Sequence, residues 1–421
     1  MPREKPRTAI VHYTAPPVVG GVEAVIEAHA KAFTQAGYPA AVVAGRGEAA
    51  ALPEAVEFIH LPMLDTQHPR VMEANAALIE GRVPSSFESL TDELEETLAP
   101  VLEPFDNVIV HNVYTKHFNL PLTAALHRLI GSHAMGHPIA WCHDFSWTSE
   151  SSRPKLSPGY PWDLLRTQRT ATTYVVVSQR RRQALASLFE CPEEEIHVVY
   201  NGVDPQMLLG LSDAGHALAT RLGLLESELN LLMPVRVTQA KNIETALRVV
   251  AALKGRGWRP KLVLTGPPDP HDARSMTYFH ELQALRADLD VEGDMRFVFE
   301  SGPDPEAPHF IDIDLVGDLF RVSDVMFMPS HREGFGMPVL EAGLVGIPVV
   351  CTPIPAAEEI GGQDVIIIQA DDDPDQIADR ILDWAEGSAR YRLRRRVRQD
   401  YTWRAIFHRD IEPLLRYKED L

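Results

Sequence analysis

The chain is poor in cysteine and has no long hydrophobic run. Its three cysteines, Cys142, Cys191 and Cys351, are widely spaced and form no C-x-x-C pair. This pattern argues against a disulfide framework and against a cysteine-based structural metal site, and it is typical of proteins from a reducing compartment. No segment approaches the roughly 18 consecutive apolar residues that a membrane-spanning helix needs.

A secretory leader is also not expected from the first residues. The basic start, Met1–Arg7, is followed by Ala9–Val11, an apolar run too short for the hydrophobic part of a signal peptide. We therefore expect a cytoplasmic protein with no stable membrane insertion.

Positive charge is in deficit, with 40 Lys and Arg against 59 Asp and Glu and a formal net charge of −19. The mean field of such a chain repels nucleic acid and anionic lipid, so we expect no nucleic-acid partner. One local exception is the arginine-rich run Tyr391–Arg398. We expect it to be a solvated helix face, and the sequence leaves contact with membrane phosphates open.

At 421 residues the chain is too long for one ordinary core, which favours two domains. Short β-type runs alternate with helical patterns throughout, which predicts parallel sheets in an α/β fold. The expected strands are Thr8–Thr14, Ala40–Ala44, Val56–Leu61, Asn107–Val113, Ile139–His143, Thr173–Ser178, Ile196–Tyr200, Leu229–Val237, Lys261–Thr265, Met295–Phe299, Asp324–Met328, Pro348–Cys351 and Val365–Ile368.

The pattern loosens around Pro205–Ser227, and we place the domain boundary there. Two Rossmann-like domains are expected, at residues 1–205 and 206–400. The last segment, 401–421, has apolar residues at helical spacing over Trp403–Tyr417. We expect it to form a helix that packs back on the first domain.

The most informative segment is Glu333–Ala342, which reads E-G-F-G-M-P-V-L-E-A. It follows a predicted buried strand, and Pro338 suits the first position of a helix. The two glycines allow close approach of a ligand, while the helix start offers free N–H groups and a positive dipole end to an anion. With Glu333 in the loop and Glu341 on the first helical turn, we interpret the segment as a cradle for a sugar linked to a phosphate. A solvated turn without a ligand remains the alternative.

A basic pair follows the first strand of the second domain. Arg236 ends that strand, and Lys241 opens the helix expected at Ile243–Leu253. A lysine at a helix start is repelled by the positive end of the helix dipole. Its presence is better explained if an anion lies in front of the helix. Arginine and lysine at strand ends would converge on the topological switch point of the sheet and grip a phosphate there. Two ordinary surface cations are the alternative.

The first domain offers two further clusters. Gly20 and Gly21 follow the first strand and begin a helix, so their N–H groups suit an anion, although the dinucleotide pattern G-x-G-x-x-G is missing. His143 and Asp144 end another strand, where they could bind phosphate, sugar or hydroxyl oxygens. An empty turn and a packed histidine remain open as alternatives.

The acceptor site is expected on nearby loops of the first domain. Polar and aromatic residues gather at His111–His117 and Phe145–Trp162. We assign acceptor binding to Tyr114, Lys116 and Asp144. Together with Arg153 and Lys155, Lys116 suggests a small anionic acceptor.

Taken together, these motifs resemble the retaining glycosyltransferases of family 4, which have the GT-B fold. The resemblance covers nearly the whole chain. It rests on G-G-V-E after the first strand, His143-Asp144, Arg236 with Lys241, Glu333–Ala342, and two shorter segments, Asn201–Asp204 and Gly346–Val350.

The resemblance implies an enzyme that moves mannose or glucose from a nucleotide diphosphate sugar, such as GDP-mannose or UDP-glucose, to a small acceptor; a compatible-solute glycoside would fit as product. Arg236 and Lys241 would bind the diphosphate, and Gly20 and Gly21 would approach it across the cleft of two facing domains. Glu333 with the amides of Gly334, Phe335, Gly336 and Met337 would hold the hexose, His143 its 6-hydroxyl, and Glu341 the ribose. The catalytic set would be His143, Arg236, Lys241 and Glu333.

No cofactor or metal is expected in this scheme. Asp312-Ile-Asp314 matches a D-x-D metal motif only formally, and Asp373 with Pro374 is better explained as a helix start. The rival functions are a sugar-nucleotide epimerase, a glycogen-type phosphorylase, or a non-catalytic sugar-nucleotide sensor. The sequence leaves homo-oligomerisation open.

Overall fold

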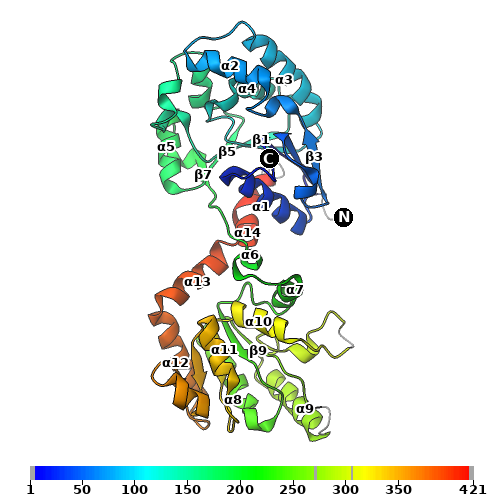
Figure 1. Cartoon of the computed structure of the whole chain (residues 1–421), viewed down its shortest axis with the longest axis vertical. Helices are drawn as coiled ribbons and strands as arrows, with labels where there is room; N and C mark the ends of the chain where they lie inside the picture. Colours follow the sequence, from blue (N-terminus) through cyan, green and yellow to red (C-terminus); the bar gives the residue numbers. More distant parts are fainter. Residues whose placement is uncertain (1–4, 270–272, 305–306, 417–421) are drawn as a thin grey trace. The chain divides into compact units, whose positions relative to one another are not determined.

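The computed structural model describes residues 5–269, 273–304 and 307–416. The chain divides into two compact units (Figure 1). Unit 1 is Met1–Gly202 with Trp403–Leu421, and unit 2 is Val203–Thr402. The boundary expected from the sequence was placed after residue 205, and the expected return after residue 400.

Unit 1 is built on a seven-stranded sheet in the order β3-β2-β1-β4-β5-β6-β7, and all its recorded strand pairs are parallel. Its strands are β1 Thr8–Thr14, β2 Ala40–Arg46, β3 Val56–His60, β4 Asn107–His111, β5 His137–Cys142, β6 Thr173–Val176 and β7 Ile196–Val198. Its longer helices are α1 Gly21–Gln35, α2 Pro69–Ile79, α3 Phe87–Leu102, α4 Leu120–Gly131 and α5 Gln179–Phe189.

The C-terminal segment completes the core of unit 1. It forms α14 Trp403–Ile406, a π-helical turn at Phe407–Ile411 and α15 Glu412–Leu415. Phe407 packs edge-on against Phe33 of α1 and Tyr38, and its neighbours Ile406 and Ile411 are fully buried in the same cluster. The helix predicted over Trp403–Tyr417 is thus interrupted by a π-turn, and Tyr417 lies outside the described residues.

Unit 2 is built on a six-stranded parallel sheet in the order β10-β9-β8-β11-β12-β13. Its strands are β8 Leu229–Met233, β9 Pro260–Leu264, β10 Met295–Phe297, β11 Val325–Met328, β12 Val349–Cys351 and β13 Ile366–Ile367. Its helices are α6 Pro205–Leu209, α7 Asp213–Arg221, α8 Ile243–Gly255, α9 Ala273–Asp288, α10 Ile313–Val322, α11 Met337–Val345, α12 Pro374–Gly387 and α13 Ala389–Asp400.

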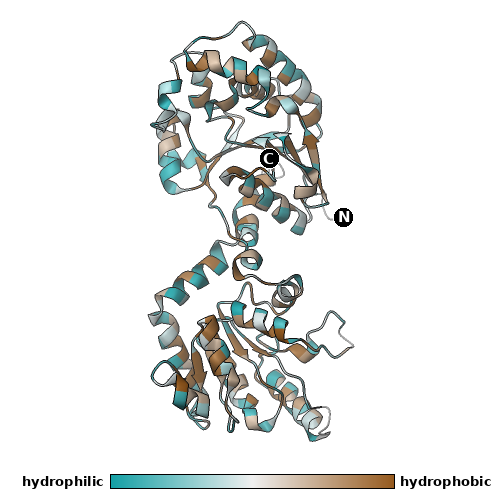
Figure 2. Cartoon of the chain, in the orientation of Figure 1, coloured by the Kyte–Doolittle hydropathy of each residue, from teal (hydrophilic) through white to brown (hydrophobic). Residues whose placement is uncertain are grey.

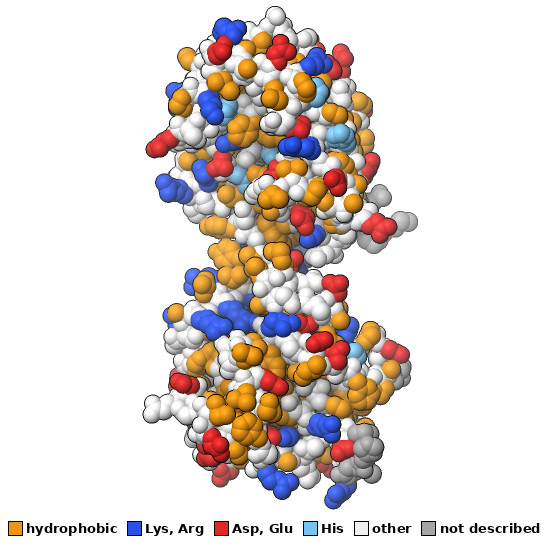
Figure 3. Space-filling model, in the orientation of Figure 1, with side chains coloured by type: hydrophobic (Ala, Val, Ile, Leu, Met, Phe, Trp, Pro, Cys, Tyr) orange, Lys and Arg blue, Asp and Glu red, His pale blue; other side chains and the backbone are white. Residues whose placement is uncertain are grey.

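The predicted α/β class with two parallel sheets is confirmed, and every expected strand run overlaps an observed strand. The central strands are buried along their whole length because helices cover both faces, so they appear as continuous hydrophobic runs. Figure 2 shows these strands in brown and the outer helix faces in teal. On the face in Figure 3, acidic and basic side chains are interspersed over both units. Among the described residues, no helix combines the length and hydropathy that a bilayer crossing requires.

The chain passes between the units twice, at Gly202–Val203 and at Thr402–Trp403, and the residues at these two points are neighbours within each unit. Within unit 2, Val203 forms a parallel bridge with Thr402, and the Val203 N–H donates to the Tyr401 carbonyl at 2.8 Å. Within unit 1, a side chain on Gly202 would collide with Trp403, whose backbone nitrogen lies 2.8 Å from the ideal Cβ position. The two ends of unit 2 therefore lie side by side, and so do the two residues of unit 1 at which its chain is interrupted.

The arginine run on α13 is only in part the solvated face that we expected, since Arg392 and Arg396 are exposed but Arg398 is not. Arg398 is buried and donates to both carboxylate oxygens of Asp324, at 3.1 and 2.7 Å. Asp324 is itself buried just before β11, and Arg394 lies 3.6 Å from it. A buried carboxylate needs such partners, because a charge that leaves water without finding a partner is costly. Removing one partner of a buried ion pair typically lowers the free energy of unfolding by about 3–5 kcal/mol.

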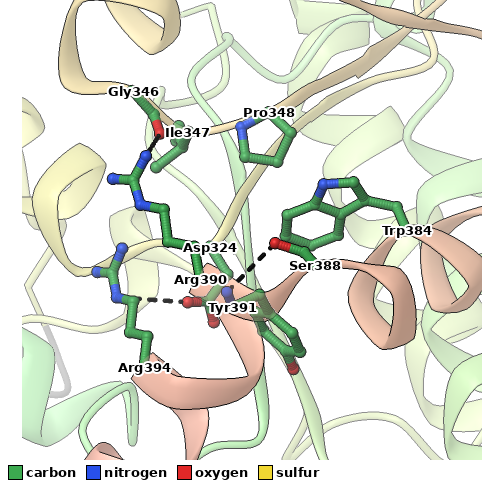
Figure 4. Close-up of a pocket in the computed structure, with 9 residues that line it drawn as sticks. All are labelled: Asp324, Gly346, Ile347, Pro348, Trp384, Ser388, Arg390, Tyr391 and Arg394. Atoms are coloured by element: carbon green, nitrogen blue, oxygen red, sulfur yellow. Dashed lines mark hydrogen bonds and ion pairs between the residues drawn. The ribbon is translucent and has the colours of Figure 1, made fainter.

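Two arginines of α13 also satisfy the ends of neighbouring helices around a cavity of about 190 Å³ (Figure 4). Arg390 donates to the carbonyl of Gly346, the C-cap of α11, at 2.6 Å, and Arg394 donates to the carbonyl of Arg321 near the end of α10. The last carbonyls of a helix lack intrahelical partners and carry negative partial charge, so these cations stabilise both ends.

We predict that Arg398→Ala lowers the unfolding free energy by about 3 kcal/mol, because it leaves Asp324 buried with a weaker partner. Urea unfolding would measure the change. The matched control is Arg396→Ala on the exposed side of the same helix, which should change stability by less than about 0.5 kcal/mol. Equal effects of the two substitutions would contradict the role given to Arg398.

Candidate functional site

The candidate residues of unit 2 lie at the topological switch point of its sheet. Strands β8 and β11 are neighbours, while the chain winds from β8 toward β9 and from β11 toward β12. Loops that leave such strands at their carboxyl ends diverge and form a crevice that binds ligands in open α/β sheets. The N–H groups of His331 and Arg332 after β11 donate to the carbonyl of Ala240, at 2.9 and 3.3 Å, and so fix the two loops together.

Lys241 and Glu333 form an ion pair across this switch point. Lys241 Nζ lies 2.6 Å from Glu333 Oε1, and Ser330 Oγ donates to the same oxygen at 2.8 Å. The side chains are only 19% and 10% exposed. Lys241 ends a 3₁₀ turn, and α8 begins after the left-handed Asn242, so the lysine precedes the helix rather than opening it.

Arg236 lies on the loop between β8 and this turn. Its side chain is exposed and has no ion-pair partner among the described residues. The backbone of Arg236 is closely covered by Gly266, where an ideal Cβ would lie 2.7 Å from the Arg236 Cα. A free guanidinium thus stands on the loop that also carries Lys241.

Gly334 and Gly336, in the turn that precedes α11 (the elbow), differ in why glycine is present. Gly336 caps α11 with φ of 99°, and its ideal Cβ would lie 2.6 Å from Ile354 Cδ1, so both conformation and space require glycine. Gly334 has no atom within 4 Å of its ideal Cβ and is exposed. No hydrogen bond among the described residues occupies the N–H groups of Gly334, Phe335 and Gly336.

Two details of the predicted helix start were wrong. Helix α11 begins at Met337, so Pro338 holds the second helical position. Glu341 is consequently on the second turn, where it is partly exposed, and no acidic residue lies in the first turn. The shift arises because the left-handed Gly336 reverses the chain one residue earlier than the proline position suggested. Phe335 and Met337 present exposed side chains on the same elbow.

In unit 1, Gly20 and Gly21 form the start of α1 after β1. Gly20 is the N-cap in extended conformation with no side-chain cap, and Gly21 is the first helical residue, with open space at its Cβ position. Glu23 folds back beneath them, accepting a hydrogen bond from the Thr14 hydroxyl, and its carboxylate would overlap a side chain on Gly20.

His143 directly follows β5 and is 9% exposed. Its ring Nε2 lies 3.0 Å from His111 Nδ1, and its backbone N–H donates to Asn112 Oδ1 at 2.8 Å. Burial is the main reason that the pKa of His143 falls to about 4, with repulsion from His12 next, so the ring is neutral at pH 7. Strands β1 and β4 mark the switch point of this sheet; His111 is the last residue of β4, and His12 lies on β1, which ends at Thr14.

The predicted acceptor residues differ in how far their side chains are exposed. Tyr114 is only 3% exposed and packs edge-on against His127 in the core, so its assignment to an exposed acceptor loop was wrong. Lys116 is partly exposed, and burial lowers its pKa. Asp144 is exposed and pairs with Arg181.

Arg181 is a candidate residue that our sequence analysis missed. It lies on the first turn of α5, between Arg180 and Arg182. Three cations at a helix start oppose the helix dipole, as Lys241 was expected to do. The same argument from the sequence could have identified Arg181. Besides burial, Arg181 and Lys155 lower the pKa of Lys116 and Asp144 raises it, so three cations act on this part of unit 1 against one carboxylate.

The formal metal motif has a structural explanation. Asp312 caps α10 by accepting from the Leu315 N–H at 2.9 Å. Asp373 caps α12 and Pro374 is its first residue, as predicted. Within the described ranges, no group of three or more His, Cys, Asp or Glu residues is placed to hold a metal ion.

Two family models match this chain, one over each half. Residues 19–207 match Glycosyltransferase Family 4, and residues 220–400 match Glycosyl transferases group 1. The chain belongs to glycosyltransferase family 4. The two parallel sheets accordingly form the two Rossmann-like domains of the GT-B fold, as the sequence predicted.

Several curated glycosyltransferases are similar to this family 4 member. An uncharacterized glycosyltransferase of Methanocaldococcus jannaschii is 29% identical over 54% of this chain and 56% of its own length. The D-inositol 3-phosphate glycosyltransferases of Stackebrandtia nassauensis and Saccharomonospora viridis are 29% and 28% identical, covering 41% and 54% of this chain. The chain spans 36% and 49% of those two relatives, so each match covers about half of its relative's length or less.

Solved structures of glycosyltransferases align with the whole chain at low identity. A glycosyltransferase from Rickettsia africae covers 99% of both chains with 16% identity and a TM-score of 0.35. Sucrose-phosphate synthase from Thermosynechococcus elongatus covers 99% of this chain and 100% of its own, with 15% identity and a TM-score of 0.40.

We predict opposite results for alanine at the two elbow glycines. Gly336→Ala should destabilise the protein by more than about 1 kcal/mol, because it adds a clash with Ile354 to a positive φ. Gly334→Ala meets open space and should leave stability unchanged within about 0.5 kcal/mol. Thermal unfolding checks both. A destabilised Gly334→Ala variant would mean that the glycine serves the fold rather than a ligand.

Proposed function

We propose that this protein transfers a hexose, mannose or glucose, from a nucleotide diphosphate sugar to a small anionic acceptor with retention of configuration. The observation that carries the proposal is the ion pair between Lys241 and Glu333 at the switch point of unit 2. A sugar 1-phosphate has an anion and hydroxyl groups a few ångströms apart. A cation and a carboxylate in contact, beside unoccupied amides, suit both parts of such a ligand.

In the proposed donor complex, Arg236 and Lys241 bind the diphosphate. Arg236 has no competing partner among the described residues, and Lys241 exchanges part of its contact with Glu333 for phosphate oxygens. Glu333 and the free N–H groups of Gly334 and its neighbours bind the hexose hydroxyls. Glu341, one turn into α11, binds the ribose.

The chemical step then depends on charge at the leaving group. The bond between the anomeric carbon and the phosphate oxygen breaks, the diphosphate takes that electron pair, and the acceptor oxygen forms the new bond. Prearranged cations stabilise this developing charge without reorganisation, which is commonly a large catalytic contribution. On the pattern of the family, the acceptor proton passes to the leaving phosphate on the same face, which gives retention.

The acceptor is proposed to be a small phosphorylated or carboxylated alcohol. The region of the loops that follow His143 and neighbour Lys116 carries an excess of positive charge, with Lys116, Lys155 and Arg181 against the one carboxylate of Asp144, which pairs with Arg181. Two of the similar proteins are named for D-inositol 3-phosphate, a phosphorylated polyol. An epimerase would need no acceptor site, and a sensor would need no excess of cations at one.

Replacing Lys241 with alanine should lower kcat at least about a hundredfold, because a developing charge loses a prearranged cation. Transfer from GDP-mannose and UDP-glucose would be measured, with calorimetry of nucleotide diphosphate binding. Lys254→Ala is the matched control, since that exposed lysine pairs with Asp290 and Asp294 at the other end of α8. Unchanged turnover in Lys241→Ala would remove this residue from the mechanism.

Replacing Arg181 with alanine should raise KM for the acceptor about tenfold and leave KM for the donor unchanged, since one charge-assisted contact of about 1.5 kcal/mol is lost. Arg182→Ala, a neighbour that pairs with Glu193 instead, is the control. If Arg181→Ala changed only the KM for the donor, Arg181 would bind the donor rather than the acceptor, and this prediction would be wrong.

Exhaustive chelation should leave transfer unaffected, because the proposed charge stabilisation uses arginine, lysine and amide groups. The rate would be compared before and after EDTA treatment and again with added Mg²⁺ or Mn²⁺. A rate that falls and is restored by either ion would contradict a metal-free reaction.

A further inference from the structure

Unit 1 contains four histidines that are buried together, of which the proposed function uses only one. His12, His29, His111 and His143 come from β1, α1, the end of β4 and the residue after β5, and none is more than 9% exposed. His111 is at the centre, with ring centroids 6.4, 5.3 and 5.3 Å from those of His12, His29 and His143.

The contact between His111 and His143 is a hydrogen bond between two imidazoles. His111 Nδ1 lies 3.0 Å from His143 Nε2, so one nitrogen carries the proton and the other accepts it. The other nitrogen of His111, Nε2, is enclosed and has no partner among the described residues. Enclosed N–H groups without acceptors are rarer in proteins than unfilled lone pairs. The proton of His111 is therefore assigned to Nδ1, and it is donated to His143.

This assignment fixes the tautomer of His143. A neutral imidazole has one donor and one acceptor nitrogen, and Nε2 of His143 is the acceptor. Its proton is consequently on Nδ1. That atom has no partner among the described residues and is not one of the enclosed unpaired atoms. It is thus the nitrogen of His143 that is open to a ligand.

The neighbours of these rings keep the arrangement in place. His12 Nδ1 donates to the carbonyl of His111 at 2.9 Å from the adjacent strand. Asn112, in the left-handed conformation with φ of 60°, accepts from the N–H groups of His143 and Asp144 at 2.8 and 3.2 Å. Residues 111 and 112 together hold both the ring and the backbone of His143.

Burial keeps these rings neutral at pH 7 against the pull of two nearby carboxylates. Glu23 of α1 lies 3.9 Å from His12 Nε2 and raises the pKa of His12, but burial lowers that pKa and is the larger effect. Asp144 raises the pKa of His143, and it is itself paired with Arg181 of α5. Burial lowers the pKa of His111 well below its usual value and is the largest effect on His143, followed by repulsion from His12. A second proton on His143 would occupy Nε2 and remove the acceptor of the His111 bond.

We propose that His111 is a positioning residue that holds His143 as the Nδ1–H tautomer, so that this N–H is the donor offered to the sugar. The inference rests on the proposed function for its catalytic consequence. Its structural part, the tautomer, stands independently. His111 itself touches no substrate in this scheme.

The test compares His111→Leu, which removes the donor, with His111→Asn, whose amide nitrogen can reach the position of Nδ1. The tautomer of His143 would be read from long-range ¹H–¹⁵N spectra of protein labelled at histidine nitrogens, with His143→Asn identifying its signals. We expect the Nδ1–H form in the native protein and in His111→Asn. In His111→Leu we expect a shift to a mixture with the Nε2–H form.

The kinetic readout uses the same variants. His111→Leu should lower kcat about tenfold with little change in donor KM, the effect of one net hydrogen bond, and should move the acid limb of the pH profile upward. His111→Asn should restore both. A His143 signal in the Nε2–H form in the native protein, or no change of tautomer in His111→Leu, would overturn the proposal. Normal tautomers in a protein that transfers no sugar would instead contradict the proposed function.

Discussion

The candidate site of unit 2 depends on opposite charges held in contact at the point where two neighbouring strands send their loops in opposite directions. Lys241 follows β8 and Glu333 follows β11, and the parallel sheet brings their loops together because both strands end at the same edge. The pair is mostly shielded from water, so each side chain needs the other or a ligand that replaces it. Ser330, the backbone of Ala240 and the glycine elbow all support this contact.

At the amino-terminal ends of the strands of the same sheet, a different set of charges stabilises the protein. Asp324 precedes β11 there, and α13 supplies Arg394 and Arg398 to it. Arg390 and Arg394 also satisfy the carboxyl ends of α11 and α10, whereas the start of α11 has no side-chain cap. The protein thus satisfies the helix ends that face away from the candidate site and leaves open the end that faces it.

The sequence was sufficient to predict the fold and the neighbourhood of the main residues. Buried parallel strands appear as unbroken apolar runs, such as Val325–Met328, and residues after them are gathered by the topology. Arg236, Lys241 and Glu333 were therefore predicted to lie at one sheet edge, although their roles stay predictions.

Contacts between distant side chains could not be predicted from local pattern. Nothing near Arg398 indicates that its partner is Asp324, 74 positions earlier. Tyr114 follows a strand and looked like a loop residue, but the left-handed Asn112 turns the chain back toward the core. The hydrogen bond between His111 and His143 joins residues 32 positions apart and is equally invisible in the sequence.

The adjoining crossings have a consequence for how the protein can be divided. Val203 bridges Thr402, and Gly202 meets Trp403, so unit 2 is an insertion whose two ends emerge at one place. Residues 203–402 form one continuous stretch of gene that could be excised and expressed as an autonomous module. The remaining flanks could be rejoined by a very short linker, so that each half becomes available for separate study or for exchange between related enzymes.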